Sequence, residues 1–160
     1  MRIGEIAIVG PGKESKQEFI EAVCDEIDVI TDNLIFGRLQ INDQLVIHLY
    51  GLELTDRELN PSWDLVSKKL LGYVVLFNWN ESESYSDVKA TIDSLVSRYK
   101  IPFVVAGILQ NKQKMVPDKF MHVELNLAEH VQLTFCKVSD PKSVRQVLIM
   151  LINSVIDKIN

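Results

Sequence analysis

Cysteine, proline and glycine are all scarce in this sequence of 160 residues, which has two cysteines, five prolines and seven glycines. Two cysteines exclude a disulfide framework, and so few glycines and prolines exclude a collagen-like repeat and a mainly disordered chain. Basic residues are also too few for a protein that wraps nucleic acid, because 17 lysines and arginines face 22 acidic residues and leave a net charge of −5. We therefore expect no nucleic-acid partner.

Long apolar runs and metal-binding patterns are also missing. The strongest apolar run, Leu70–Phe77, is too short to span a bilayer as a helix, and Met1–Glu5 leads directly into an expected strand rather than into a signal peptide. Cys24 and Cys136 stand far apart, and none of the three histidines has a metal-type spacing to another ligand. We expect two reduced, buried thiols in a cytoplasmic protein that has no transmembrane segment and no metal site.

The residues that are present are those of an ordinary globular domain, with 47% hydrophobic and 24% charged residues. A chain of this length buries roughly 70% of its unfolded surface, so residues 1–160 are predicted to form a single domain. Apolar runs alternate with stretches of helical periodicity. We expect strands at Ile3–Val9, Leu34–Ile41, Gln44–Leu49, Gly72–Asn78, Phe103–Ile108 and Val131–Lys137, and helices from Ser15 through Ile27, at Ser62–Leu70, at Ser84–Tyr99 and after the cap Asp140-Pro141.

This alternation predicts an α/β fold, a three-layer sandwich around a mostly parallel sheet of six strands. One strand is expected to be antiparallel, because the turn formers Asn42-Asp43 indicate a tight hairpin at that point of the chain. In open α/β sheets, ligands bind beyond the carboxyl ends of the strands. The candidate site is therefore the edge that begins with Gly10.

A degenerate phosphate-binding motif follows the first strand. A P-loop reads G-x-x-x-x-G-K-[ST]; here Gly10 and Lys16 have the required spacing, while Ser15 replaces the second glycine and Gln17 replaces the Ser/Thr. Ser15 adds a Cβ where the backbone approaches phosphates, and the Gln17 amide replaces the hydroxyl that ligates Mg²⁺. Two interpretations remain: a phosphate site that keeps its lysine, or a plain glycine-rich turn with a solvated lysine.

Three phrases of the sequence, residues 6–17, 31–38 and 45–57, resemble the Ras-like small GTPases, and most closely the bacterial gliding-motility-type branch. The resemblance implies a small-GTPase-like, P-loop NTPase fold. It also places Thr31 where that branch has a Mg²⁺-sensing threonine. A lone threonine in a loop is also an ordinary turn or capping residue.

The same resemblance implies that the chemistry of the family is lost. Leu54 and Thr55 stand where the branch has the glycine that meets the γ-phosphate and the glutamine that positions water. The guanine-reading motif Asn-Lys-x-Asp lacks its aspartate, whether it is aligned on Ile108–Asn111 or on Asn111–Lys114. Together with Gln17, these departures affect four nucleotide-facing positions.

The sequence therefore predicts a noncatalytic pseudo-GTPase, a protein-interaction or regulatory module with no catalytic residue and no cofactor. The alternative is a small GTP- or ATP-binding protein that keeps residual phosphate binding through Gly10 and Lys16, with little or no hydrolysis. A receiver-type domain is disfavoured, because Val9-Gly10 end the first strand where paired acidic residues are required. In the alternative, GTP or GDP with Mg²⁺ is expected to be bound by Gly10, Gly12, Ser15, Lys16, Gln17 and Thr31.

An apolar group in the loops of the same edge is the candidate partner-binding patch. It consists of Leu52, Leu54, Trp63 and Trp79. Such a group is either an exposed binding surface or a set of side chains that fold inwards and fill the emptied pocket. The resembled GTPases work with roadblock/longin-type dimers, so the resemblance implies a protein partner of that type.

Overall fold

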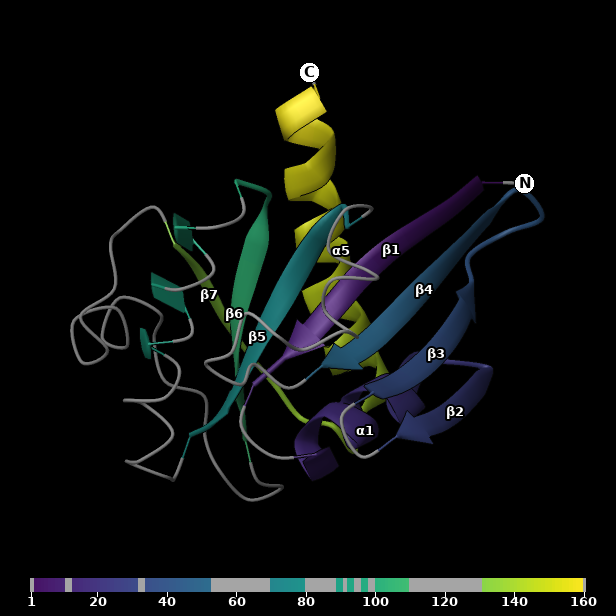
Figure 1. The fold of residues 1–160 in the computed structure, drawn as a ribbon, viewed down its shortest axis with the longest axis horizontal. Helices are drawn as coiled ribbons and strands as arrows, with labels where there is room; N and C mark the ends of the chain where they lie inside the picture. The colour runs from purple at the N-terminus through teal and green to yellow at the C-terminus, as the bar shows by residue number, and fades with distance from the viewer. Residues whose placement is uncertain are drawn as a thin grey trace.

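The computed structural model describes residues 2–10, 13–31, 34–52, 70–79, 89–90, 92–93, 96–97, 100–109 and 131–159 (Figure 1). In this part of the chain, one mixed sheet has seven strands in the order β2-β3-β4-β1-β5-β6-β7. Their bounds are β1 Arg2–Val9, β2 Glu26–Thr31, β3 Leu34–Gln40, β4 Leu45–Leu52, β5 Gly72–Asn78, β6 Phe103–Ile108 and β7 Gln132–Cys136.

Strand β1 lies in the middle of the sheet and pairs in parallel with β4 on one side and β5 on the other. Its last four residues, Ile6 to Val9, are completely or almost completely buried. A strand that is covered on both faces needs an apolar run without alternation, and this is the pattern that the sequence has there. The predicted α/β class and the mostly parallel pairing are confirmed.

The predicted hairpin is confirmed, and it makes β3 antiparallel to β4. The side-chain oxygen Oδ1 of Asn42 accepts hydrogen bonds from the N–H groups of Gln44 and Leu45, at 2.7 and 2.9 Å. An asparagine side chain that bonds to the backbone two and three residues further on closes a tight turn. Strand β4 continues to Leu52, three residues beyond its predicted end.

The number of strands differs from the prediction, because the sheet has a seventh strand, β2. The first helix, α1 (Lys13–Val23), ends four residues before Ile27. The Asp25 N–H donates to the carbonyl of Arg38, and the chain then pairs antiparallel with β3. Ile27 lies four residues after Val23, so its position fits the apolar stripe of a helix, but it also fits the alternation of a strand. It forms a strand because β3 has a free edge with which this segment can pair.

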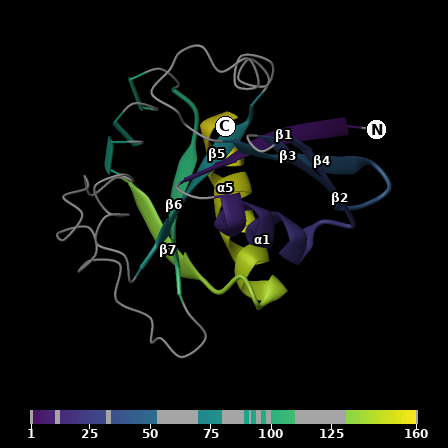
Figure 2. The same ribbon diagram turned by 60° about the horizontal axis from the view of Figure 1, so that its bottom comes forward.

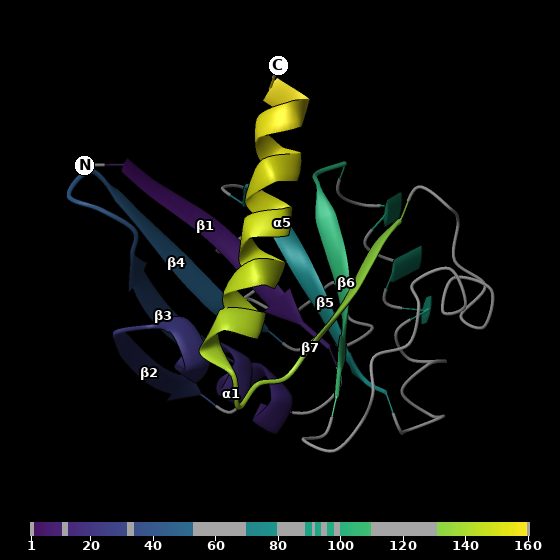
Figure 3. The same ribbon diagram turned by 180° about the vertical axis from the view of Figure 1, so that it is seen from behind.

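The two helices that are described along their whole length, α1 and α5 (Pro141–Ile159), lie on the same face of the sheet (Figure 3). Phe19 and Ile20 of α1 and Val144 and Leu151 of α5 join one apolar cluster with Ile8 of β1. The predicted start of α5 is confirmed, since the Asp140 side chain accepts a hydrogen bond from the Lys142 N–H at 3.1 Å and Pro141 is the first helical residue.

The opposite face of the sheet carries a second apolar cluster, formed by β1, β4, β5, β6 and β7 with Ile92. In the predicted helix 84–99, the described residues are helical, namely 89–90, 92–93 and 96–97. The predicted helix 62–70 lies outside the described residues apart from Leu70, which is not helical.

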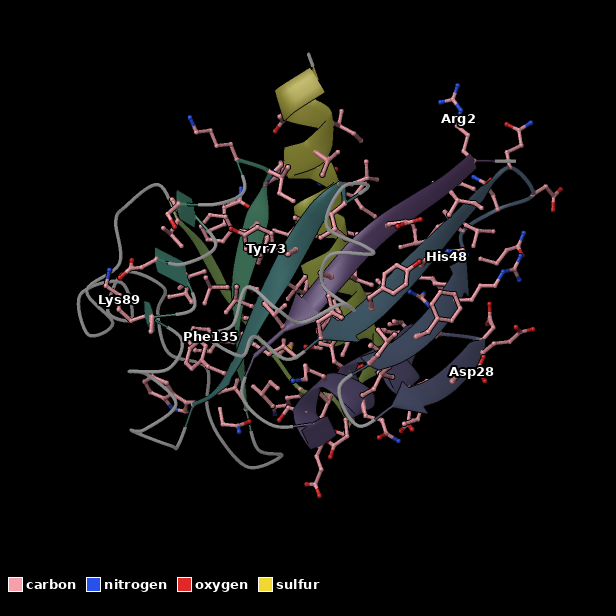
Figure 4. The ribbon with its side chains drawn as sticks, viewed as in Figure 1. Arg2, Asp28, His48, Tyr73, Lys89 and Phe135 are labelled. Atoms are coloured by element: carbon pink, nitrogen blue, oxygen red, sulfur yellow. The ribbon has the colours of Figure 1, made fainter. Side chains whose placement is uncertain are left out.

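Tyr73 of β5 lies fully buried in this second cluster (Figure 4). Its ring stacks on Phe103 of β6, with ring centroids 5.1 Å apart and planes 3° from parallel. Its hydroxyl has no hydrogen-bond partner among the described residues, and burial raises the pKa of that hydroxyl. A buried hydroxyl without a partner destabilises the folded state.

We expect Tyr73→Phe to leave the ring stack intact and to raise the free energy of unfolding by about 1 kcal/mol, because it removes the unsatisfied hydroxyl. Tyr73→Ala, which also removes the ring, is expected to lower that free energy by about 3–5 kcal/mol. Urea unfolding of both variants tests this. A loss of stability in Tyr73→Phe would show that the hydroxyl has a partner in solution.

Both cysteines are free thiols, and Cys136 is buried as expected, whereas Cys24 is only partly buried. Burial raises the pKa of Cys136 from 9.0 to about 12, and burial followed by the charge of Asp25 does the same for Cys24. The folded protein therefore keeps both protons at pH values where the unfolded chain releases them. This contribution to stability is complete below pH 9 and is lost as the pH rises towards 12.

We accordingly expect the free energy of unfolding to fall between pH 9 and pH 11, in the presence of a reductant. Cys136→Ala is expected to make this decrease shallower, because one of the groups that bind a proton differently in the two states is gone. Urea unfolding at a series of pH values measures the slope. An unchanged slope in Cys136→Ala contradicts the expectation.

Candidate functional site

The candidate site is the carboxyl edge of the sheet, where β1 is followed by the turn into α1 (Figure 2). The parallel registers pair Val9 with both Leu52 of β4 and Val75 of β5, and they pair Asn78 of β5 with Ile108 of β6. These strand ends therefore lie next to one another. A ligand of an open α/β sheet binds at this edge.

Gly10 begins the turn after β1 and is required there by its backbone. It has a φ of +150°, which L side chains rarely adopt, and a Cβ at this position would lie 2.4 Å from the carbonyl oxygen of Leu76. The close approach to β5 therefore admits only glycine. This requirement exists whether or not a phosphate is bound.

Lys16 lies in the second turn of α1 and is 2% exposed. It is buried because it shares a helix face with Phe19, Ile20 and Val23, which pack on the sheet at the spacing of the helical repeat. Its ammonium Nζ donates a hydrogen bond to the carbonyl oxygen of Gly10 at 2.9 Å. The structure thus brings Gly10 and Lys16 together, and it rules out the interpretation of Lys16 as a solvated lysine.

The two substituted P-loop positions are bonded to protein groups. The Ser15 hydroxyl lies 3.4 Å from the side-chain oxygen Oδ1 of Asn78, to which it donates. The Gln17 amide donates to the Glu21 carboxylate at 2.9 Å, one turn further along the helix. Gln17 is therefore held along α1 by an i,i+4 pair of the kind that stabilises helix surfaces.

Asn78 is not among the candidate residues named from the sequence, although the sequence places residues 78–80 at the ligand edge. It is the last residue of β5 and joins that strand to the start of α1 through Ser15. The available signal was its position, because a polar residue that directly follows a buried parallel strand lies at the ligand edge. The other predicted residues are less informative: Thr31 ends β2, and Gly12 lies outside the described residues.

The predicted partner-binding group is only partly described, and its described members pack inwards. Leu52 is 0% exposed and belongs to the second apolar cluster, so it supplies no surface and is withdrawn from the patch. Trp79 is half-buried against the same cluster, and its ring meets Phe135 edge to face at 5.9 Å. Leu54 and Trp63 lie outside the described residues.

Cys136, the last residue of β7, also ends a strand at this edge, and its burial makes it unsuited as a nucleophile. It is almost completely buried, and its pKa of about 12 keeps it protonated at neutral pH. In the described part of the chain, three or more His, Cys, Asp or Glu residues nowhere gather into a group that could hold a metal ion. No helix in that part of the chain is long and apolar enough to cross a membrane.

Comparison with known proteins adds no family assignment. No protein-family model matches the sequence, and no match is found among the curated proteins. The site is therefore interpreted from its own chemistry: a buried cation held against the end of β1, with polar side chains that bond to each other.

We expect Gly10→Ala to lower the free energy of unfolding by about 2–3 kcal/mol, because it forces both a rare φ and a contact with the backbone of β5. Gly51→Ala is the matched control. Its Cβ would meet side-chain atoms of Ile20 and Ile35 at 3.2 and 3.3 Å, which can move. Thermal or urea unfolding should show a larger loss for Gly10→Ala. Equal losses would mean that the turn can relax.

Proposed function

We propose that this chain is a noncatalytic, GTPase-like (pseudo-GTPase) module that binds or regulates another protein and does not hydrolyse nucleotide. The observation that carries the proposal is the environment of Lys16. A P-loop uses this lysine to reach the β- and γ-phosphates of a nucleotide. Here it is 2% exposed and donates to the carbonyl of Gly10, so it ties the start of α1 to the end of β1. A structural role for the lysine is consistent with loss of the ligand.

The position of the Mg²⁺ ligand supports the same proposal. Nucleotide hydrolysis in P-loop proteins requires a hydroxyl directly after the lysine, on which the metal ion is held. Gln17 stands there and bonds to Glu21 along the helix surface. The residues present therefore do not fit a Mg²⁺–nucleotide.

The sheet is compatible with a small-GTPase-like, P-loop NTPase form of the α/β fold. As that resemblance implies, an antiparallel strand, β3, precedes a parallel strand, β4, which pairs directly with β1. The lysine lies on the helix that follows β1, at the carboxyl edge. The additional edge strand β2 is outside what the resemblance implies.

A second candidate is favoured by one specific observation. Lys16 is a buried cation beside the start of a helix, at the sheet edge where α/β proteins bind anions. Residual phosphate binding through Gly10 and Lys16, for GTP or ATP, would use that charge. In this case Nζ would move from the Gly10 carbonyl to a phosphate oxygen.

The proposed partner is a protein, encountered in the cytoplasm, and a roadblock/longin-type dimer follows from the resemblance to gliding-motility GTPases. Among the candidate patch residues, Trp79 is the described one that keeps partial exposure. Its indole is fixed against Phe135, so it presents a preorganised aromatic edge. Leu54 and Trp63 remain proposed members of the same patch.

We expect calorimetric titration with GTP, GDP and ATP, each with Mg²⁺, to show no binding in the micromolar range. Lys16→Met, whose side chain has a similar length and no charge, is expected to give the same result as the wild type. Micromolar binding by the wild type that is lost in Lys16→Met would overturn the proposal and establish the second candidate. Lys142→Met, at an exposed cation of α5, controls for a general loss of positive charge.

A further inference from the structure

A groove lies between the flank of α5 and the sheet, on the face that both helices occupy. Its volume is about 390 Å³. The floor is formed by Ile6, Leu39 and Ile47, which come from three neighbouring strands. The wall is a helical stripe of α5, and the lining of the wall and rim consists of Gln40, Ile41, Arg145, Leu148, Ile149 and Ile152.

The groove exists because α1 is short. Ile20 of α1 packs over Gly37 and Gly51, close enough that a Cβ at Gly37 would lie 2.3 Å from its Cγ2 atom. Leu39 lies two residues beyond Gly37 along β3, and the register pairs it with Ile47. At this row, the described helical residues that line the groove all come from α5.

The rim of the groove is apolar and accessible. Ile41 is 46% exposed and Ile149 is 41% exposed, and both belong to the few large apolar side chains that the described surface exposes. Large apolar side chains around a concave site are the usual lining of a ligand pocket, and the volume falls at the small end of the range for such pockets.

Arg145 is the one charged residue among the described residues of the lining. It lies on the same helix face as Leu148, Ile149 and Ile152, three, four and seven residues further on. The described part of the chain offers it no ion pair and no hydrogen bond to its side chain. An apolar trough with one guanidinium at its rim matches a molecule with an aliphatic body and one carboxylate, because guanidinium binds carboxylate through two parallel hydrogen bonds.

We propose that this groove binds a free fatty acid, with the aliphatic chain over Ile6, Leu39 and Ile47 and the carboxylate on Arg145. The site lies towards the amino-terminal end of β1, away from Lys16 and the carboxyl edge. It is therefore independent of the proposed pseudo-GTPase function and of whether any nucleotide binds.

Dodecanoate, used below its micellar concentration, is the probe. Calorimetry is expected to give a Kd on the order of 100 µM or below. Arg145→Gln should weaken dodecanoate binding about three- to tenfold, the effect of losing one partly exposed charged hydrogen-bonded pair. Lys142→Gln, an exposed cation of α5 outside the groove, should leave the affinity unchanged.

Two further probes separate the carboxylate from the chain. Dodecan-1-ol has the same chain without the charge, so Arg145→Gln should not change its affinity. An acyl chain attached to another protein also lacks a free carboxylate, and its binding should be equally insensitive to Arg145→Gln. Dodecyltrimethylammonium should bind more weakly than dodecanoate. Equal affinities of the three probes, or equal effects of Arg145→Gln and Lys142→Gln, would overturn the proposal.

The location is tested by methyl NMR on isoleucine-labelled protein. The methyl signals of Ile41, Ile47 and Ile149 should shift on addition of dodecanoate, while those of Ile92 on the other face of the sheet should not. Sedimentation of the free protein tests a second copy of this chain as occupant. Self-association that Arg145→Gln weakens, without dodecanoate binding, would make the groove an interface and refute the fatty-acid site.

Discussion

The close packing of helix α1 on the sheet is the constraint on which the other features depend. Two glycines of the antiparallel pair, Gly37 and Gly51, lie beneath Ile20, and Gly37 also lies beneath Cys24. Because these positions have no side chains, α1 packs closely enough on the sheet to bury the side chains on its inner face. Packing at this density leaves no room for a larger residue at Gly37, where a Cβ would lie 2.3 Å from Cγ2 of Ile20, and it is less tight at Gly51.

The burial of Lys16 is a direct consequence of that packing. Lysine on the inner face of a helix has to bring its ammonium to a polar group, since an uncompensated charge in an apolar interior is costly. The carbonyl of Gly10 supplies one such group at the end of β1. In this way one residue of a phosphate-binding motif takes part in holding the turn between strand and helix.

Because α1 is short, it does not cover the sheet at the amino-terminal ends of the strands. The helix has 11 residues, whereas α5 has 19 and crosses the same face from the carboxyl edge towards the amino-terminal ends of the strands. Figure 3 shows the two helices side by side only near the start of α5. The groove beside Arg145 and the buried lysine are thus two results of one packing arrangement, one where α1 covers the sheet and one where it has ended.

Several elements could be predicted from the chain because their signals are local. Uninterrupted apolar runs predict buried parallel strands such as β5. The turn formers Asn42-Asp43 predict the hairpin, and the capping pair Asp140-Pro141 predicts the start of α5. The Gly10–Lys16 spacing also predicted that these two residues lie together at the carboxyl edge of the sheet, and they do. These features depend on hydrogen bonds and periodicities within a few residues.

Other features were decided only by contacts between distant segments. Ile27 fits either a helix stripe or a strand, and the unpaired edge of β3 determines that it belongs to β2. Leu52 reads as the start of an exposed loop, yet β4 extends through it because β1 continues alongside as far as Val9. Asn78 gains its role from Ser15, 63 residues away in the sequence. Local sequence patterns determined which segments form strands and helices. The pairing of strand edges and the close packing of the helices on the sheet determined which side chains are buried, which contact each other, and where a groove remains on the surface.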